Sequence, residues 1–288
     1  MIKMKFISFK HDNIEKFGII ENNLITDLTG KIGAASNLKE LIKIKKIKEA
    51  KEYAKSNPGS IKTEEIEYSP LIPNPGKIIC VGLNYIEHAK ETNRTIEENP
   101  VIFHRFPESQ TAHMQAIQRP SVSKSLDFEG EMAVIMDEGG KHIKSEEALK
   151  HVVGFSCYNE STIREWQRHT RQFGMGKNFE KTGSFGPHMV LAQDIPDYKR
   201  LTIETRLNGE VMQNAKLSQL IFDIPILISY VSKAMAWRAG DVLVTGTPGG
   251  VGSKRNPPVY MKPGDNVEVE ITNIGVLSNT VKDEIIHQ

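Results

Sequence analysis

The chain of 288 residues contains only two cysteines, Cys80 and Cys157, and each stands among aliphatic or aromatic neighbours. Two isolated cysteines do not provide the disulfide framework of a small secreted protein, and neither belongs to a Cys-x-x-Cys pair. The N-terminal residues also lack the apolar core of a signal peptide. We therefore expect a soluble, cytoplasmic protein.

An excess of charge of either sign is also absent, because 37 Lys and Arg residues stand against 36 Asp and Glu residues. Proteins that bind nucleic acid through its phosphates usually carry a surplus of basic residues, so nucleic acid is not an expected partner. The most apolar run, residues 224–237, is interrupted by Pro225 and Lys233 and is shorter than the roughly 18 residues that a membrane span needs. Small-molecule chemistry in a soluble protein is the class that remains.

The composition of the chain changes near residue 70. Residues 1–70 are rich in Lys, Ile, Asn and Glu and predict a small β-containing N-terminal domain with an amphipathic helix over 38–55. The prolines of segment 70–76 predict a linker, because proline neither continues a helix nor completes a strand ladder. Residues 71–288 predict a larger domain in which short strands and turns outnumber helices.

Turn and capping residues mark several elements of the larger domain. Asn84, followed three residues later by Glu87, predicts a capping box at the start of a helix that places His88 and Glu91 on one face. A histidine beside a glutamate can act as an oriented base, although such a pair is also common on protein surfaces. Asn208-Gly209 predicts a tight hairpin between two strands.

Acidic residues alternate with apolar or small ones over residues 127–131, which puts Asp127, Glu129 and Glu131 on one face of a strand. Alternate strand residues lie ~6.6 Å apart, so carboxylates that converge there repel one another unless a cation lies between them. Oxygen ligands without His or Cys indicate Mg²⁺ or Mn²⁺, with Ca²⁺ as a substitute in a crystal. An edge strand with solvated acids explains the pattern equally well.

Residues 158–177 combine acidic, basic, amide and aromatic side chains. Glu160 can supply a further carboxylate to a metal, and Gln167 and Lys177 can contact a substrate carboxylate or a developing oxyanion. Arg164, which has acidic neighbours, is also typical of an ordinary salt-bridged helix.

A glycine-rich loop follows the predicted strand that ends at Val244. The loop has neither the Lys-Ser/Thr of a nucleotide-binding P-loop nor the glycine spacing of a dinucleotide fold, so a phosphate site is disfavoured. Its backbone N–H groups and Thr247 can still hold a small carboxylate.

Several motifs, in this order along residues 77–281, resemble the fumarylacetoacetate hydrolase family. They are Val81-Gly82-Leu83-Asn84-Tyr85 with His88, Asp127-Phe128-Glu129-Gly130-Glu131, Arg164 with Gln167, Gly176-Lys177, Gly186-Pro187, Asn208-Gly209-Glu210 with Gln213, and Gly240-Asp241 leading to Thr245-Gly246-Thr247-Pro248. The resemblance implies an α+β fold, a mixed β roll or distorted β-barrel with short helices, and a homodimer.

The resemblance also assigns roles to residues of this chain. It implies metal ligands at Glu129, Glu131 and Glu160, and it leaves Asp127 outside the ligand set. It implies catalytic roles for His88, Glu91 and Lys177. The substrate contacts that we expect are Gln167, Arg164, Arg105, Thr247 and Tyr85.

The implied reaction is a divalent-metal-dependent cleavage of a C–C bond in a small 2,4-dioxo acid, with His88 and Glu91 activating water. A lyase or isomerase acting on a small 2-oxo acid, such as an oxaloacetate decarboxylase or a hydratase, is the alternative within the family. Three departures from the family pattern leave a catalytically impaired, metabolite-binding relative as a third possibility: Glu160 replaces an aspartate, Arg105 replaces a lysine, and Ala112 with Met114 replaces glycines in a loop expected near the pocket.

Overall fold

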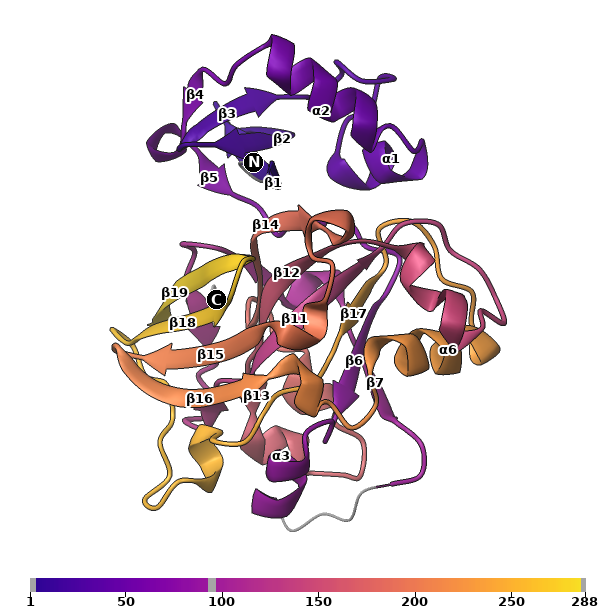
Figure 1. Cartoon of the computed structure of the whole chain (residues 1–288). Helices are drawn as coiled ribbons and strands as arrows, with labels where there is room; N and C mark the ends of the chain where they lie inside the picture. Colours follow the sequence, from indigo (N-terminus) through magenta and orange to yellow (C-terminus); the bar gives the residue numbers. More distant parts are fainter. Residues whose placement is uncertain (1–3, 93–96, 286–288) are drawn as a thin grey trace.

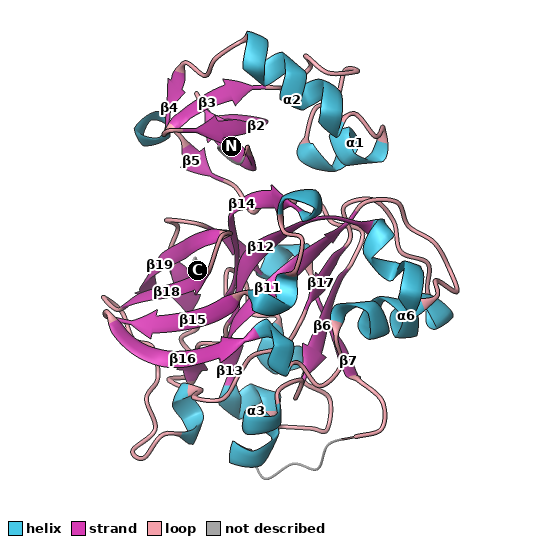
Figure 2. Ribbon diagram, in the orientation of Figure 1, coloured by secondary structure: helices cyan, strands magenta, loops and turns pink. Residues whose placement is uncertain are grey.

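The structure is a computed structural model that describes residues 4–92 and 97–285. Strands dominate it and helices are few and short (Figure 2). The first five strands and two helices form the upper part of the molecule, and the remaining elements form the larger lower part (Figure 1). None of the described helices is both long and apolar enough to cross a membrane.

The largest sheet has twelve strands and runs through both parts. Its strands are β1 (Lys5–His11), β2 (Ile14–Glu21), β3 (Leu24–Asp27), β4 (Ile61–Lys62), β5 (Glu67–Tyr68), β6 (Ile78–Gly82), β7 (Val101–Arg105), β8 (Gln110–Ala112), β11 (Gly130–Met136), β12 (Val152–Glu160), β14 (Gly183–Leu191) and β17 (Val242–Val244). The order is β4-β3-β2-β1-β14-β12-β11-β17-β6-β7, with β5 paired to β1 and β8 to β14. The N-terminal strands thus continue the main sheet through the antiparallel β1–β14 pair. The predicted division near residue 70 stays a prediction.

Two smaller sheets complete the strand architecture. A five-stranded sheet has the order β16-β15-β18-β19-β9, and a two-stranded sheet pairs β10 with β13. Their bounds are β9 (Ile117–Arg119), β10 (Leu126–Asp127), β13 (Thr162–Ile163), β15 (Thr202–Leu207), β16 (Glu210–Lys216), β18 (Asn266–Ile271) and β19 (Gly275–Asp283). The predicted hairpin is confirmed, since Asn208 and Gly209 join β15 to β16 with φ of 53° and 82°. Both residues tolerate this left-handed conformation, which a tight hairpin turn requires.

The helices correct two predictions. They are α1 (Leu38–Lys43), α2 (Ile47–Ser56), α3 (Ile86–Glu91), α4 (Arg164–Gln167), α5 (Gly174–Lys177) and α6 (Ile224–Ala234). The single helix predicted over 38–55 is wrong, because Lys45 adopts a left-handed φ of 57° between α1 and α2. The capping box at Asn84 is also wrong, because its buried amide hydrogen-bonds to Phe222 and to the Thr245 carbonyl, and Tyr85 precedes α3 instead.

The α+β class is confirmed, and the sheets are open rather than closed into a barrel. Strand β11 lies in the middle of the main sheet and is buried along its whole length. Its side chains alternate between two hydrophobic clusters, with Val134 in the one that contains α6 and Ile135 in the one that contains α1. A strand covered on both faces is a rigid support for the residues at its ends.

Candidate active site

A cavity of about 540 Å³ lies at the ends of the central strands of the main sheet. It is lined by residues from segments 81–103, 129–177 and 247–254, which are far apart in the sequence. The structure brings eight predicted site residues together in this lining: His88, Glu129, Glu131, Glu160, Arg164, Gln167, Lys177 and Thr247.

Three carboxylates converge at the buried end of the cavity. Glu131 is on β11, Glu129 directly precedes this strand, and Glu160 ends the neighbouring strand β12. The antiparallel pairing of β11 with β12 places Glu160 beside Glu129, where the Glu160 N–H donates to the Glu129 carbonyl at 2.8 Å. One carboxylate oxygen from each residue lies within 4.8 Å of the other two, and all three side chains are buried. Hard oxygen donors at this spacing suit a divalent cation such as Mg²⁺ or Mn²⁺.

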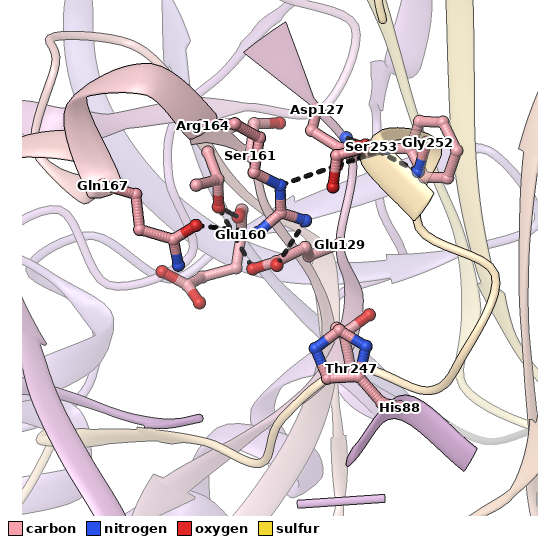
Figure 3. A network of polar contacts seen from close by, with 12 residues as sticks. His88, Asp127, Glu129, Glu160, Ser161, Arg164, Gln167, Thr247, Gly252 and Ser253 are labelled. Carbon is pink, nitrogen blue, oxygen red and sulfur yellow. Dashed lines mark hydrogen bonds and ion pairs between the residues drawn. The ribbon is translucent and has the colours of Figure 1, made fainter. Parts of the chain in front are cut away.

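Two basic side chains neutralise part of this negative charge. The Lys177 Nζ lies 2.5 Å from Glu129 Oε2 and 2.8 Å from Glu160 Oε2, and Arg164 Nη2 lies 2.7 Å from Glu129 Oε1. Figure 3 shows Arg164 between Glu129 and Asp127, with His88 and Thr247 on the other side of Glu129. Burial alone would raise the pKa of Glu129, but Arg164 and Lys177 outweigh it and hold this pKa below its usual range.

Glu131 has a different environment. Its Oε2 accepts a hydrogen bond from the Gly246 N–H at 2.5 Å, and no Lys or Arg of the described chain forms an ion pair with it. Burial, followed by repulsion from Glu160 and Glu129, raises the pKa of Glu131 well above its ordinary value. The negative charge of the three carboxylates is therefore not fully balanced near Glu131. Their oxygen atoms fit a divalent cation, which would supply the missing positive charge.

His88 and Glu91 form a hydrogen-bonded pair on α3. The His88 Nδ1 lies 2.7 Å from Glu91 Oε1, and Glu91 Oε2 accepts from the Gly250 N–H at 2.9 Å. The glycine-rich loop therefore holds the carboxylate that orients the histidine. Because Nδ1 contacts Glu91, the Nε2 atom of His88 is left for a molecule in the cavity.

Asp127 lies behind the ligand set, as we expected. It is fully buried, and its carboxylate contacts Arg164 Nε at 2.6 Å and the N–H groups of Gly252 and Ser253 at 2.8 and 3.0 Å (Figure 3). The residue thus joins the Arg164 side chain to the loop that closes one side of the cavity.

Two predicted substrate contacts, Arg105 and Tyr85, do not line the cavity. The buried Arg105 guanidinium donates to Glu160 Oε1 at 3.3 Å and to Thr182 Oγ1 at 2.7 Å, so it supports a predicted metal ligand from behind. The Tyr85 side chain packs into the hydrophobic cluster beside α6. The structure therefore places neither side chain at the cavity: contacts with distant residues occupy the Arg105 guanidinium, and the Tyr85 hydroxyl is buried without a hydrogen-bond partner in the described structure.

The loop that carries Ala112 and Met114 is also not at the cavity. The Met114 N–H donates to the Ser278 carbonyl at 2.8 Å, and the Ala112 carbonyl accepts from Asn279 Nδ2 at 2.7 Å. These contacts hold the end of β8 and the residue that follows it by two positions against β19, and neither Ala112 nor Met114 lines the cavity.

Further supporting residues were not predicted as site residues. Gln213 accepts from the Gly130 N–H at 3.0 Å and donates to Thr247 Oγ1 and to the Pro248 carbonyl, each at 2.8 Å. It thereby joins β16 to the start of β11 and to the glycine-rich loop. Thr162 donates to Glu129 Oε2 at 3.1 Å and could have been suspected only from its place in the polar run after residue 158.

An open α+β fold with a buried carboxylate cluster beside a histidine–glutamate pair defines the class of a small-molecule enzyme that can use a divalent metal. Comparison with known proteins makes the class specific. Residues 77–282 match the family described as fumarylacetoacetate (FAA) hydrolase C-terminal, and the chain belongs to this enzyme family.

Two curated relatives and one solved structure illustrate the similarity. Oxaloacetate tautomerase YisK of Bacillus subtilis (strain 168) is 40% identical over 221 residues, which is 75% of this chain and 73% of the relative. The mitochondrial oxaloacetate tautomerase Fahd2a of Rattus norvegicus is 39% identical over 222 residues, 77% of this chain and 71% of the relative. The structure of fumarylacetoacetate hydrolase (EaFAH) from psychrophilic Exiguobacterium antarcticum has a TM-score of 0.86 at 33% identity, covering 98% of this chain and all of that one. The expected homodimer and cytoplasmic location stay predictions.

Proposed function

We propose that this protein interconverts the keto and enol forms of a small 2-oxo acid in a divalent-metal-dependent reaction, with oxaloacetate as the first substrate to test. One observation carries the proposal: three buried carboxylates within 4.8 Å of one another and the His88 side chain line the same cavity. The two oxaloacetate tautomerases, at 39% and 40% identity, support this class of substrate.

Glu129, Glu131 and Glu160 would hold Mg²⁺ or Mn²⁺, and the bound ion would polarise the 2-oxo group and stabilise an enolate. Lys177, with Nζ at 2.5 and 2.8 Å from Glu129 and Glu160, keeps these two carboxylates together. Its ammonium group would also donate a hydrogen bond to a substrate oxygen that gains negative charge. Gln167 and Thr247 also line the cavity, and the Gln167 NH₂ group and the Thr247 backbone N–H would donate to the substrate carboxylate. The Thr247 hydroxyl already donates to the Gly130 carbonyl at 3.0 Å.

His88 would remove the proton from the carbon next to the 2-oxo group. Its Nδ1 contact with Glu91 at 2.7 Å leaves Nε2 to accept this proton and stabilises the imidazolium that forms. Return of the proton to the substrate oxygen gives the enol, and return to carbon gives the keto form. The Gly250 N–H fixes Glu91 throughout, so the base keeps its orientation.

Cleavage of a C–C bond in a 2,4-dioxo acid resembling acylpyruvate or fumarylpyruvate is our second candidate. The His88–Glu91 pair favours it, because an oriented base can also activate water for attack on a carbonyl. The cavity of about 540 Å³ has room for such a substrate. Decarboxylation of oxaloacetate requires the same enolate and is a further variant.

Proton NMR in D₂O tests these reactions together. Oxaloacetate, acetylpyruvate and fumarylpyruvate are incubated with the enzyme, with either Mg²⁺ or EDTA, beside a blank without enzyme. We expect Mg²⁺-dependent exchange of the C3 protons of oxaloacetate that is lost in His88→Gln and kept in His104→Gln, a control at an exposed histidine on β7.

The products distinguish the alternatives. Pyruvate together with the matching acid from a 2,4-dioxo substrate would make the protein a hydrolase, and pyruvate from oxaloacetate would make it a decarboxylase. If no substrate shows a metal-dependent change, the proposed reactions are wrong, and a catalytically impaired relative that binds metabolites becomes the favoured alternative.

A further inference from the structure

The mouth of the cavity carries three basic side chains that the proposed chemistry does not use: Arg168, Arg171 and Lys254. All three residues are exposed, whereas the three glutamates at the other end are buried. Glu97 is the one acidic residue besides these glutamates in the described lining. The cavity therefore leads from an acidic floor to a mouth in which positive charge is in excess.

These basic side chains form no hydrogen bond or ion pair with residues in the described part of the chain, whereas exposed Arg200 pairs with Asp197 at 3.1 Å. The acidic residue nearest in sequence to Arg168 is Glu165, three positions earlier, but its Oε2 accepts from Ser123 Oγ at 2.6 Å. The guanidinium and ammonium groups at the mouth are thus free to meet an anion that enters the cavity.

The segment that carries the two arginines is held at both ends. It connects α4 to α5, and these short helices pack so closely that a Cβ at Gly176 would lie 2.3 Å from the Gln167 nitrogen. Phe173 also packs edge-on against Phe103, with ring centroids 5.7 Å apart. The segment therefore stays beside the cavity that Gln167 and Lys177 line.

Lys254 approaches from another segment. It ends a single 3₁₀ turn, Gly252–Lys254, whose first two N–H groups donate to the buried Asp127 carboxylate. Figure 3 shows Gly252 and Ser253 on one side of Arg164 and Gln167 on the other. Two anchored segments thus bring positive charge to the mouth from different directions.

We propose that Arg168, Arg171 and Lys254 bind a second carboxylate at the far end of the substrate, so that they select dicarboxylic 2-oxo acids over monocarboxylic ones. This inference rests on the proposed function, which places the 2-oxo end of the substrate at the acidic floor. In a dicarboxylate that spans the cavity, the 2-oxo end meets the acidic floor and the far carboxylate pairs with the basic residues at the mouth. A 2-oxo acid with an apolar tail leaves these three cations without a partner.

Calorimetric binding in the presence of Mn²⁺ tests the inference without relying on turnover. The probes are 2-oxoadipate and 2-oxohexanoate, which have the same chain length and differ in the far carboxylate. We expect Arg171→Gln, Arg168→Gln and Lys254→Gln to weaken 2-oxoadipate binding, by about tenfold for the arginines, and to leave 2-oxohexanoate within twofold. Arg171→Lys should restore part of the loss, and Arg238→Gln, at an exposed arginine outside the cavity lining, should change neither.

The outcomes separate this inference from the proposed function. The inference is overturned if the wild-type protein binds 2-oxoadipate and 2-oxohexanoate equally well, or if it does not bind 2-oxoadipate. It is also overturned if the variants lose the same affinity for both acids. If the dicarboxylate preference disappears in Arg171→Gln while no substrate undergoes C3 exchange, the mouth is assigned correctly and the reaction is not. If exchange of oxaloacetate proceeds but the variants keep the dicarboxylate preference, the reaction stands and the role of the mouth is wrong.

Discussion

Replacement of Asp127 by asparagine tests whether the buried ionic contacts around the carboxylate cluster hold the cavity in shape. The Asp127 side chain is fully buried and contacts Arg164 Nε at 2.6 Å, while the N–H groups of Gly252 and Ser253 donate to it at 2.8 and 3.0 Å. An asparagine of nearly the same size keeps one oxygen and turns an NH₂ group toward these donors. The substitution therefore removes charge and acceptors without creating a cavity.

The loss of stability in Asp127→Asn has two main sources, a broken buried ion pair and a buried N–H group left without an acceptor. Loss of one partner from a buried ion pair costs about 3–5 kcal/mol, and a buried N–H without an acceptor costs about 1–3 kcal/mol. Arg164 keeps its contact with Glu129 at 2.7 Å, which reduces the first cost. We expect the free energy of unfolding to fall by about 3–4 kcal/mol. At ~2 cal/mol/K of unfolding entropy per residue, this loss lowers the Tm by about 5–7 °C.

Urea denaturation and differential scanning fluorimetry measure this effect, with Asp283→Asn as the matched control. Asp283 pairs with Arg119 at 2.7 Å, but its side chain is 57% exposed, so its loss should cost less than about 1 kcal/mol. If Asp127→Asn costs no more than the control, the buried network does not stabilise the fold and our account of this side of the cavity is wrong.

Two further predictions concern α3 and a buried histidine. Glu91→Gln should lower kcat by about 10²-fold with little change in metal affinity, because Glu91 orients His88. The control is Glu87→Gln on the same helix, which should change neither quantity because Glu87 pairs with Lys90 in solvent. Equal kcat values for the two variants would show that Glu91 does not orient the base. Burial lowers the pKa of His188 to about 4, and an unfolded histidine titrates near ~6.5, so the unfolded state binds more protons and the protein should lose stability as the pH falls from about 6.5 toward 4. His188→Gln should reduce this pH dependence of the Tm, and an unchanged slope would contradict the assignment.

The features that could be predicted depend on residues that are close to one another in the sequence. The hairpin at Asn208-Gly209 is found where it was predicted, because both residues adopt the left-handed conformation that a tight turn requires. The acidic alternation over 127–131 indicated a carboxylate cluster, and Glu129 and Glu131 do converge. The single strand predicted there is wrong, because Asp127 ends β10 and contacts Arg164, whereas β11 begins at Gly130. Residue periodicity and turn chemistry act over a few positions, so a single sequence is enough to recognise them.

The features that could not be predicted depend on residues brought together by the fold. Asn84 is a favourable helix-capping residue, but its amide forms hydrogen bonds with Phe222 and Thr245, so tertiary contacts override the local preference. Gln213 belongs to a family motif, but it lies 83 positions from Gly130, and no local pattern shows that the two residues are hydrogen-bonded. Hydrogen bonds between residues this far apart in the sequence cannot be predicted unless the order of the strands in the sheet is known.

The two ends of the cavity are built differently, so the residues proposed for the reaction and those proposed for substrate selection lie on different parts of the fold. The glutamates at the floor lie at the ends of β11 and β12, two strands that are buried along their whole lengths, so a change there disturbs the core and the reaction together. The basic residues at the mouth are exposed on short segments outside the sheet, and the described structure does not use their charges for folding. Substitutions at the mouth can therefore change which acid enters while the fold and the floor stay intact, and a loss of stability in those variants would show that the mouth supports the fold as well.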